Sequence, residues 1–241
     1  MKKILENFKK MSLLYKIASI AFLAALVTLI FSTLFGYIGD IFFFGLFKAM
    51  FANVYGFFAV ILYFIQSILQ LLFVAALITA LFSGNRKNVA FVLLCKAVLI
   101  AVNLFFVTPF MRILLVISYG FQASIIPGST VYSGFISFIL MIALIALSAL
   151  LFNGLGKFTK PAAFITVGLF SVIFVTDIVR FITAIVDSVK DFIQGNVASG
   201  VFGLTANTTG QCVSIIMACG YIVLTLATII VIKAKKTPAG S

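Results

Sequence analysis

The sequence predicts an all-α, polytopic membrane protein with six transmembrane helices, and three observations support this. Of the 241 residues, 64% are hydrophobic and only 9% are charged, with a mean hydropathy of +1.31. A soluble domain is about half apolar and about a quarter charged, so this chain needs lipid as its solvent. Long apolar runs recur six times, and the Lys and Arg residues gather in short clusters at the ends of those runs.

Each of the six apolar runs has the length of about 20 residues that a membrane span requires. They cover residues 14–36, 55–82, 89–108, 131–152, 162–183 and 212–232. No segment between them is long enough for a folded soluble domain, so residues 1–241 are predicted to form a single transmembrane helical domain. The first run is longer than the apolar core of a secretory signal, so we expect it to be retained as a helix.

The segments that connect the runs alternate in character. Two short connections, 83–88 and 153–160, are basic, and so are both ends of the chain. Short loops rich in Lys and Arg stay in the cytoplasm. The pattern therefore predicts three helical hairpins with the N- and C-termini cytoplasmic.

The longer connections contain apolar stretches with one to three charges each, at 40–51, 110–121 and 182–193. We expect them to be amphipathic crossover segments on the outer side of the membrane. The second should be separate from the third span because Pro109 interrupts a helix. Two interpretations remain: the segments lie in the membrane interface, or they re-enter the bilayer partway.

Polar side chains inside the spans are candidates for a solute-binding site, because polar groups in hydrocarbon are costly unless they have a partner or a task. Counted from the cytoplasmic end of each helix, they lie at depths of about 18 to 27 Å. This predicted polar layer in the outer half of the bundle consists of Gln66, Gln70, Asn103, Asp177 and Arg180.

Asp177 and Arg180 are three residues apart, so their side chains share one helical face. One hypothesis places them in a hydrated cavity with the polar groups of the second and third helices. The other holds that the two charges neutralise each other near the outer interface. Gln66 and Gln70 would then serve only as hydrogen-bonding contacts between helices.

Lys96 is expected at about 10 Å from the cytoplasmic end of the third helix. No acidic residue is expected at that depth. Its ammonium group could reach back to the cytoplasmic headgroups along the flexible stem of the side chain. The alternative is that Lys96 faces an anionic substrate or lipid in a cavity.

Several functional classes are excluded by composition. The net charge of +12 lies at the ends of the spans and not on one face, so nucleic acid is not an expected partner. The chain has no His, and its three cysteines do not have the spacing of a metal site. We therefore predict no catalytic residue, no metal site and no cofactor, and a protein that is not an enzyme.

Two functions remain. The first is a transporter, or a membrane-embedded binding subunit, for a small solute or ion. The alternative is a non-catalytic structural subunit of a larger membrane complex for secretion, conjugation or export. The expected partners are the lipid bilayer and either other membrane subunits or further copies of this chain. The abundance of Phe, Ile and Lys and the absence of Trp favour a prokaryotic plasma membrane protein.

The first span contains an Ala-x-x-x-Ala pair, Ala21 and Ala25. It resembles the first helix of the substrate-binding subunits of energy-coupling-factor vitamin transporters, which also have six helices with both ends inside. The resemblance covers one helix in six, and small residues at this spacing serve close helix packing in many membrane proteins. It does not assign the chain to that family.

Overall fold

The computed structural model describes residues 11–42, 46–120, 128–153, 159–197 and 208–236, and within these ranges the regular structure is helical. Six helices are long and apolar enough to cross a membrane, as in a multi-pass membrane protein. The basic residues 1–10, the middle of the loop at 153–160 and residues 198–207 of the last outer connection lie outside the described ranges.

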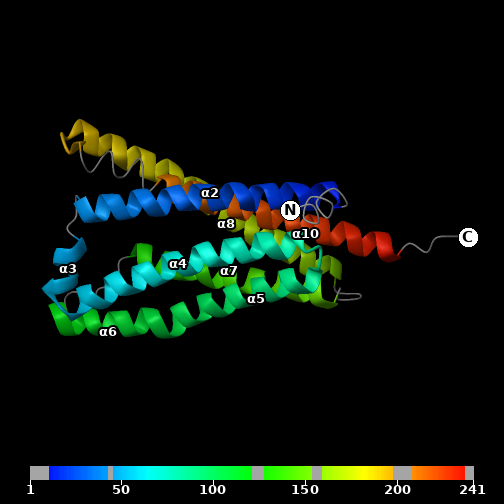
Figure 1. Ribbon diagram of the computed structural model, residues 1–241, viewed down its shortest axis with the longest axis horizontal. Coiled ribbons are helices and arrows are strands. Elements are labelled where there is room, and N and C mark those ends of the chain that lie inside the picture. The colour runs from blue at the N-terminus through cyan, green and yellow to red at the C-terminus, as the bar shows by residue number, and fades with distance from the viewer. Residues whose placement is uncertain (1–10, 43–45, 121–127, 154–158, 198–207, 237–241) are drawn as a thin grey trace, which may run out of the picture.

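The predicted spans correspond to helices that are mostly longer than expected. The helices are α2 (Leu13–Phe42), α3 (Leu46–Ala52), α4 (Val54–Phe82), α5 (Arg86–Val102), α6 (Thr108–Tyr119), α7 (Gly128–Asn153), α8 (Thr159–Ile193) and α10 (Thr208–Lys236). A π-helical segment, η1 (Asn103–Val107), joins α5 to α6. In Figure 1, successive long helices run in opposite directions, and α2 begins at the end of the bundle where α10 finishes.

Local sequence signals fix the ends of several helices. Asn53 begins α4, and its side-chain Oδ1 accepts a hydrogen bond from the Gly56 amide at 2.8 Å. Asn85 begins α5 in the same way, with the Lys87 amide as donor at 3.0 Å. Between α4 and α5, Gly84 has a φ of 68°, which residues with a side chain rarely adopt. The Asn85 cap and Gly84 make a tight turn, so α5 folds back beside α4.

The helices pack in two groups of three. On one side α10 packs against both α2 and α8, and on the other α5 packs against α4 and α7 (Figure 1). Contacts between α2 and α4 and between α7 and α8 join the two groups. In the part of the chain that the structure describes, neither α4 nor α5 packs extensively against α8 or α10. Side chains of these four helices nevertheless belong to one hydrophobic core, with Phe73 and Leu93 on one side and Phe170 and Tyr221 on the other.

Several buried hydroxyl groups bond within their own helix. Thr166, Thr225 and Ser148 donate to the carbonyl four residues earlier at 2.7 Å. This arrangement satisfies a polar group in an apolar environment without a partner on another helix.

The expectation that Pro109 ends the third span is wrong. Helix continues from Arg86 to Tyr119 through the π segment, a stretch of 34 residues. Pro109 stands in the first turn of α6, where the missing amide hydrogen has no necessary partner. At the start of that turn, the Thr108 amide bonds to the Asn103 carbonyl across the wider π turn. The extra residue of the π turn lets the helix absorb the proline.

The α6 segment packs against α4 and does not form a crossover. Asn53 Nδ2 donates to the Tyr119 hydroxyl at 2.7 Å, and the Tyr55 amide donates to Ser118 Oγ at 3.3 Å. The rings of Phe58 and Phe110 meet edge to face with centroids 5.6 Å apart. These contacts hold α6 parallel to the bundle, which differs from the interfacial or re-entrant helix expected at 110–121.

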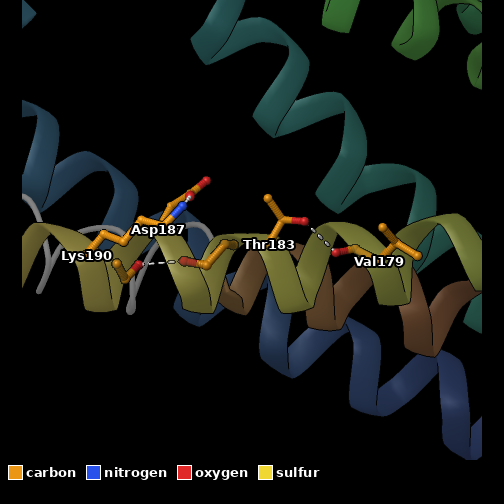
Figure 2. Close-up of polar contacts among 6 residues, drawn as sticks. Val179, Thr183, Asp187 and Lys190 are labelled. Atoms are coloured by element: carbon orange, nitrogen blue, oxygen red, sulfur yellow. Dashed lines mark hydrogen bonds and ion pairs between the residues drawn. The ribbon is translucent and has the colours of Figure 1, made fainter.

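The segment 182–193 is not a separate crossover either, because α8 runs without interruption for 35 residues. A helix of this length spans about 52 Å, well beyond a hydrocarbon core of about 30 Å. Figure 2 shows local contacts along this part: Thr183 donates to the Val179 carbonyl at 2.9 Å, and Lys190 pairs with Asp187 at 3.5 Å. Of the three predicted crossovers, only 40–51 contains a separate short helix, α3, and its residues 43–45 are not described.

Candidate functional site

A half-open cavity of about 160 Å³ lies where α4 and α5 face α8 and α10. Polar or charged side chains from four helices line it. They are Gln70 on α4, Lys96 on α5, Asp177 on α8, and Ser214 and Tyr221 on α10. The remaining lining is apolar and comes from Phe73, Leu140, Phe170, Ile173, Val213, Met217 and Ala218.

Three of the six predicted site residues therefore lie together. Gln70, Lys96 and Asp177 line the same cavity, although they are far apart in the sequence. Arg180 joins them indirectly, because its guanidinium Nη1 lies 3.8 Å from Asp177 Oδ1. Asp177 is only 4% exposed, whereas the side chain of Arg180 is 33% exposed and stands at the edge of the site.

Gln66 and Asn103 are exposed and are not among the cavity-lining residues. Gln66 lies one helical turn from Gln70 on the same face of α4. Asn103 begins the π segment of the third span. The structure thus does not assemble all five residues of the predicted polar layer around one cavity.

Lys96 lines the same cavity as Asp177, although the sequence predicted no acidic residue at its depth. Its ammonium is 5.1 Å from the centre of the Phe73 ring. That position matches the cavity-facing alternative for this side chain and not the one in which it reaches back to the headgroups.

Aromatic packing forms one wall of the cavity. The Phe170 and Tyr221 rings stack with centroids 4.8 Å apart and an interplanar angle of 18°. Phe22 on α2 meets the Tyr221 ring edge to face at 5.2 Å. These contacts between three helices hold the Tyr221 ring in a fixed position.

Sequence reasoning did not assign Ser214 or Tyr221 to the site. A serine in an apolar span gives little signal, because its hydroxyl can bond within its own helix. Tyr221 gave a stronger one, since a phenol well inside a span lies away from the membrane interface where tyrosine is usually found. Its position in the cavity depends on how α10 is rotated against α2 and α8.

Comparison with known proteins gives no assignment: no family model matches the chain, and no curated protein or solved structure is significantly similar to it.

Proposed function

We propose that this chain binds a small solute in the cavity between α4, α5, α8 and α10, and that it works as a transporter or as a membrane-embedded binding subunit. The observation that carries the proposal is the convergence of polar side chains from four helices on one cavity in the middle of the bundle. Ionisable residues inside membrane spans are costly and mark substrate or ion pathways in many membrane proteins.

The charged residues support binding more than simple neutralisation. A self-contained pair of Asp177 and Arg180 would not require Gln70 or Lys96 to lie at the same cavity. Gln66 continues the face of Gln70 by one turn toward the N-terminal end of α4, which suits a path into the cavity.

The proposed orientation follows the basic loops. The turn at Ser83–Asn85 and the C-terminal end of α10 would face the cytoplasm, and the six spans would form three hairpins in a prokaryotic plasma membrane. Solute would then reach the cavity from the outer side, along the face that carries Gln66.

Access of water to the cavity tests this proposal. In a variant with Cys95, Cys212 and Cys219 replaced by Ala, Ser214→Cys should react with a water-soluble, membrane-impermeant thiosulfonate in proteoliposomes. Val172→Cys is the matched control, because Val172 lies on α8 between two cavity residues in sequence but is exposed away from the cavity lining. Lipid should shield the Val172→Cys thiol from the reagent. If Ser214→Cys is as unreactive as Val172→Cys, the cavity is closed to water and the proposal fails.

A second function, as a structural subunit of a larger membrane complex, is favoured by one observation on α8. The part of this helix beyond residue 181 carries an exposed apolar stripe of Ile182, Val186, Val189 and Ile193. These residues recur at helical spacing, so they lie along one face. Another subunit or a second copy of this chain would cover them. Isolation of a stoichiometric complex after mild solubilisation, lost in Val186→Glu, would favour this function.

A further inference from the structure

Lys96 lines the cavity and makes no ion pair among the residues that the structure describes. The carboxylate of Asp177 forms an ion pair with Arg180 at 3.8 Å. Within the described ranges, no carboxylate oxygen lies within 4.0 Å of the Lys96 ammonium. Its contact there is the face of the Phe73 ring, which attracts a cation but does not neutralise it. The Lys96 ammonium is therefore a positive charge in a membrane-embedded site, with no carboxylate in contact with it among the described residues. Such a charge is costly unless an anion accompanies it.

The size of the cavity limits what that anion can be. An apolar cavity of about 150 Å³ holds a benzene molecule, and one water molecule occupies about 30 Å³ of liquid volume. At about 160 Å³, this cavity fits a compact organic molecule and is several times larger than a halide ion needs.

The lining suits a molecule with one charged end and a flat apolar body. The stacked Phe170 and Tyr221 rings give a broad apolar wall, and Phe73 carries the ammonium of Lys96 on its face. Gln70 and Ser214 supply hydrogen-bond donors that can reach a second oxygen of an anion. A carboxylate has two such oxygens and prefers charged donors.

We infer that the cavity binds a small monocarboxylate with a compact, flat, apolar body, that Lys96 binds the carboxylate, and that the Phe170–Tyr221 wall contacts the body. This inference rests on the proposed function and names the class of its solute. A bound carboxylate neutralises the Lys96 ammonium, and a low-dielectric surrounding strengthens this attraction.

A series of ligands with the same shape and different charge tests the inference. Benzoate, benzamide and benzylamine share a phenyl ring and carry a negative charge, no charge and a positive charge, respectively. The full chain in a neutral detergent without chloride is heated with each compound at matched ionic strength. Benzoate should raise the midpoint of thermal unfolding in a saturable way, since a ligand that binds only the folded state stabilises it. Benzamide, benzylamine and sodium chloride should not.

Two variants assign the binding to named residues. Lys96→Met keeps the length of the side chain and removes the charge, so benzoate should bind at least tenfold more weakly. Lys87→Met is the matched control, because it removes an exposed lysine from the same helix outside the cavity, and it should bind benzoate as the unchanged chain does. Ser214→Phe fills the cavity and should abolish the effect of every cavity ligand.

Each other outcome has a distinct meaning. Benzamide or benzylamine could stabilise the chain as much as benzoate does, and Ser214→Phe could abolish that effect. This result would overturn the carboxylate class and leave the proposed function standing. If chloride alone stabilises the chain, the inference that the ligand has an organic body is wrong. If no compound stabilises the chain and Ser214→Cys is closed to water, the inference and the proposed function both fail. The ligand series uses the unchanged chain, so it decides the ligand class even if Lys96→Met does not fold.

Discussion

The ammonium of Lys96 lies 5.1 Å from the centre of the Phe73 ring, and both residues line the central cavity between α5 and α4. Without a bound anion, the attraction of the ring does not offset the cost of placing the Lys96 ammonium in the membrane. The ring offers about 0.5–2 kcal/mol of attraction, and a lysine at the centre of a membrane helix costs about 2.5–3.5 kcal/mol on insertion scales.

Lys96→Met should therefore stabilise the ligand-free protein, by about 0.5–3 kcal/mol from the difference between these two effects. The thioether keeps the stem of the side chain against Phe73 and removes the desolvated charge. Thermal unfolding in detergent measures the change, and Lys87→Met should leave stability almost unaltered. A marked loss of stability in Lys96→Met would mean that the charge has a structural partner.

The pair of Asp177 and Arg180 should respond unequally to single substitutions. Arg180→Met leaves a nearly buried carboxylate without its cation at 3.8 Å, which should destabilise the fold by about 1–3 kcal/mol. Asp177→Asn should cost less, because the partly exposed Arg180 side chain can still reach water or headgroups.

The double variant Asp177→Asn/Arg180→Met should be more stable than Arg180→Met alone, since it removes both charges. Chemical or thermal unfolding of the four proteins gives the coupling. Equal costs for the two single substitutions, with strict additivity, would show that the ion pair is unimportant for stability.

Gly220 should be intolerant of a side chain. A Cβ atom there would lie 2.9 Å from the ring of Phe22, which is fully buried between α2 and α10. Gly220→Ala should therefore lose about 1–3 kcal/mol through overpacking. Gly168→Ala is the matched control, because nothing lies within 4 Å of a Cβ at that position of α8, and it should gain up to about 1 kcal/mol from helix propensity.

Phe22→Leu should partly restore the stability of Gly220→Ala by making room for the new methyl group. Rescue by this second substitution separates a clash with the ring from a general intolerance of α10. If Gly220→Ala is as stable as Gly168→Ala, α2 and α10 are not packed as closely as the structure shows.

The continuity of the third span can be tested by a cross-link. The Tyr55 amide and Ser118 Oγ are 3.3 Å apart, so Tyr55→Cys and Ser118→Cys should form a disulfide under mild oxidation in the cysteine-free background. Tyr55→Cys with Ile113→Cys is the control, because Ile113 is exposed and more than one turn from Ser118. A crossover lying flat in the interface would give no selective cross-link.

The proposed orientation predicts labelling from opposite sides. In cells, Asn85→Cys in the α4–α5 turn should be protected from an impermeant maleimide, whereas Val197→Cys beyond the end of α8 should react. Permeabilised cells provide the control, in which both positions should be labelled. Reaction of Asn85→Cys in intact cells would reverse the orientation.

The sequence by itself determined that six stretches of this chain can cross a membrane, since the transfer of a helix into lipid depends on hydropathy summed over about 20 residues. It also singled out Gln70, Lys96 and Asp177, because the cost of a polar group in hydrocarbon is a property of the residue and its depth. Neither result depends on which helices are neighbours.

The tertiary structure alone decided which polar residues meet. Each residue turns a helix by about 100°, so small differences in start and rotation decide whether a side chain faces the cavity. Gln70 lines the cavity and Gln66 does not, whereas Tyr221 joins the site through its packing between Phe22 and Phe170. The path past Pro109 was decided by a π turn and by the contacts of α6 with α4, which hydropathy does not encode. The rotation of each helix follows from the side chains of its neighbours, and those neighbours are fixed only by the packed bundle.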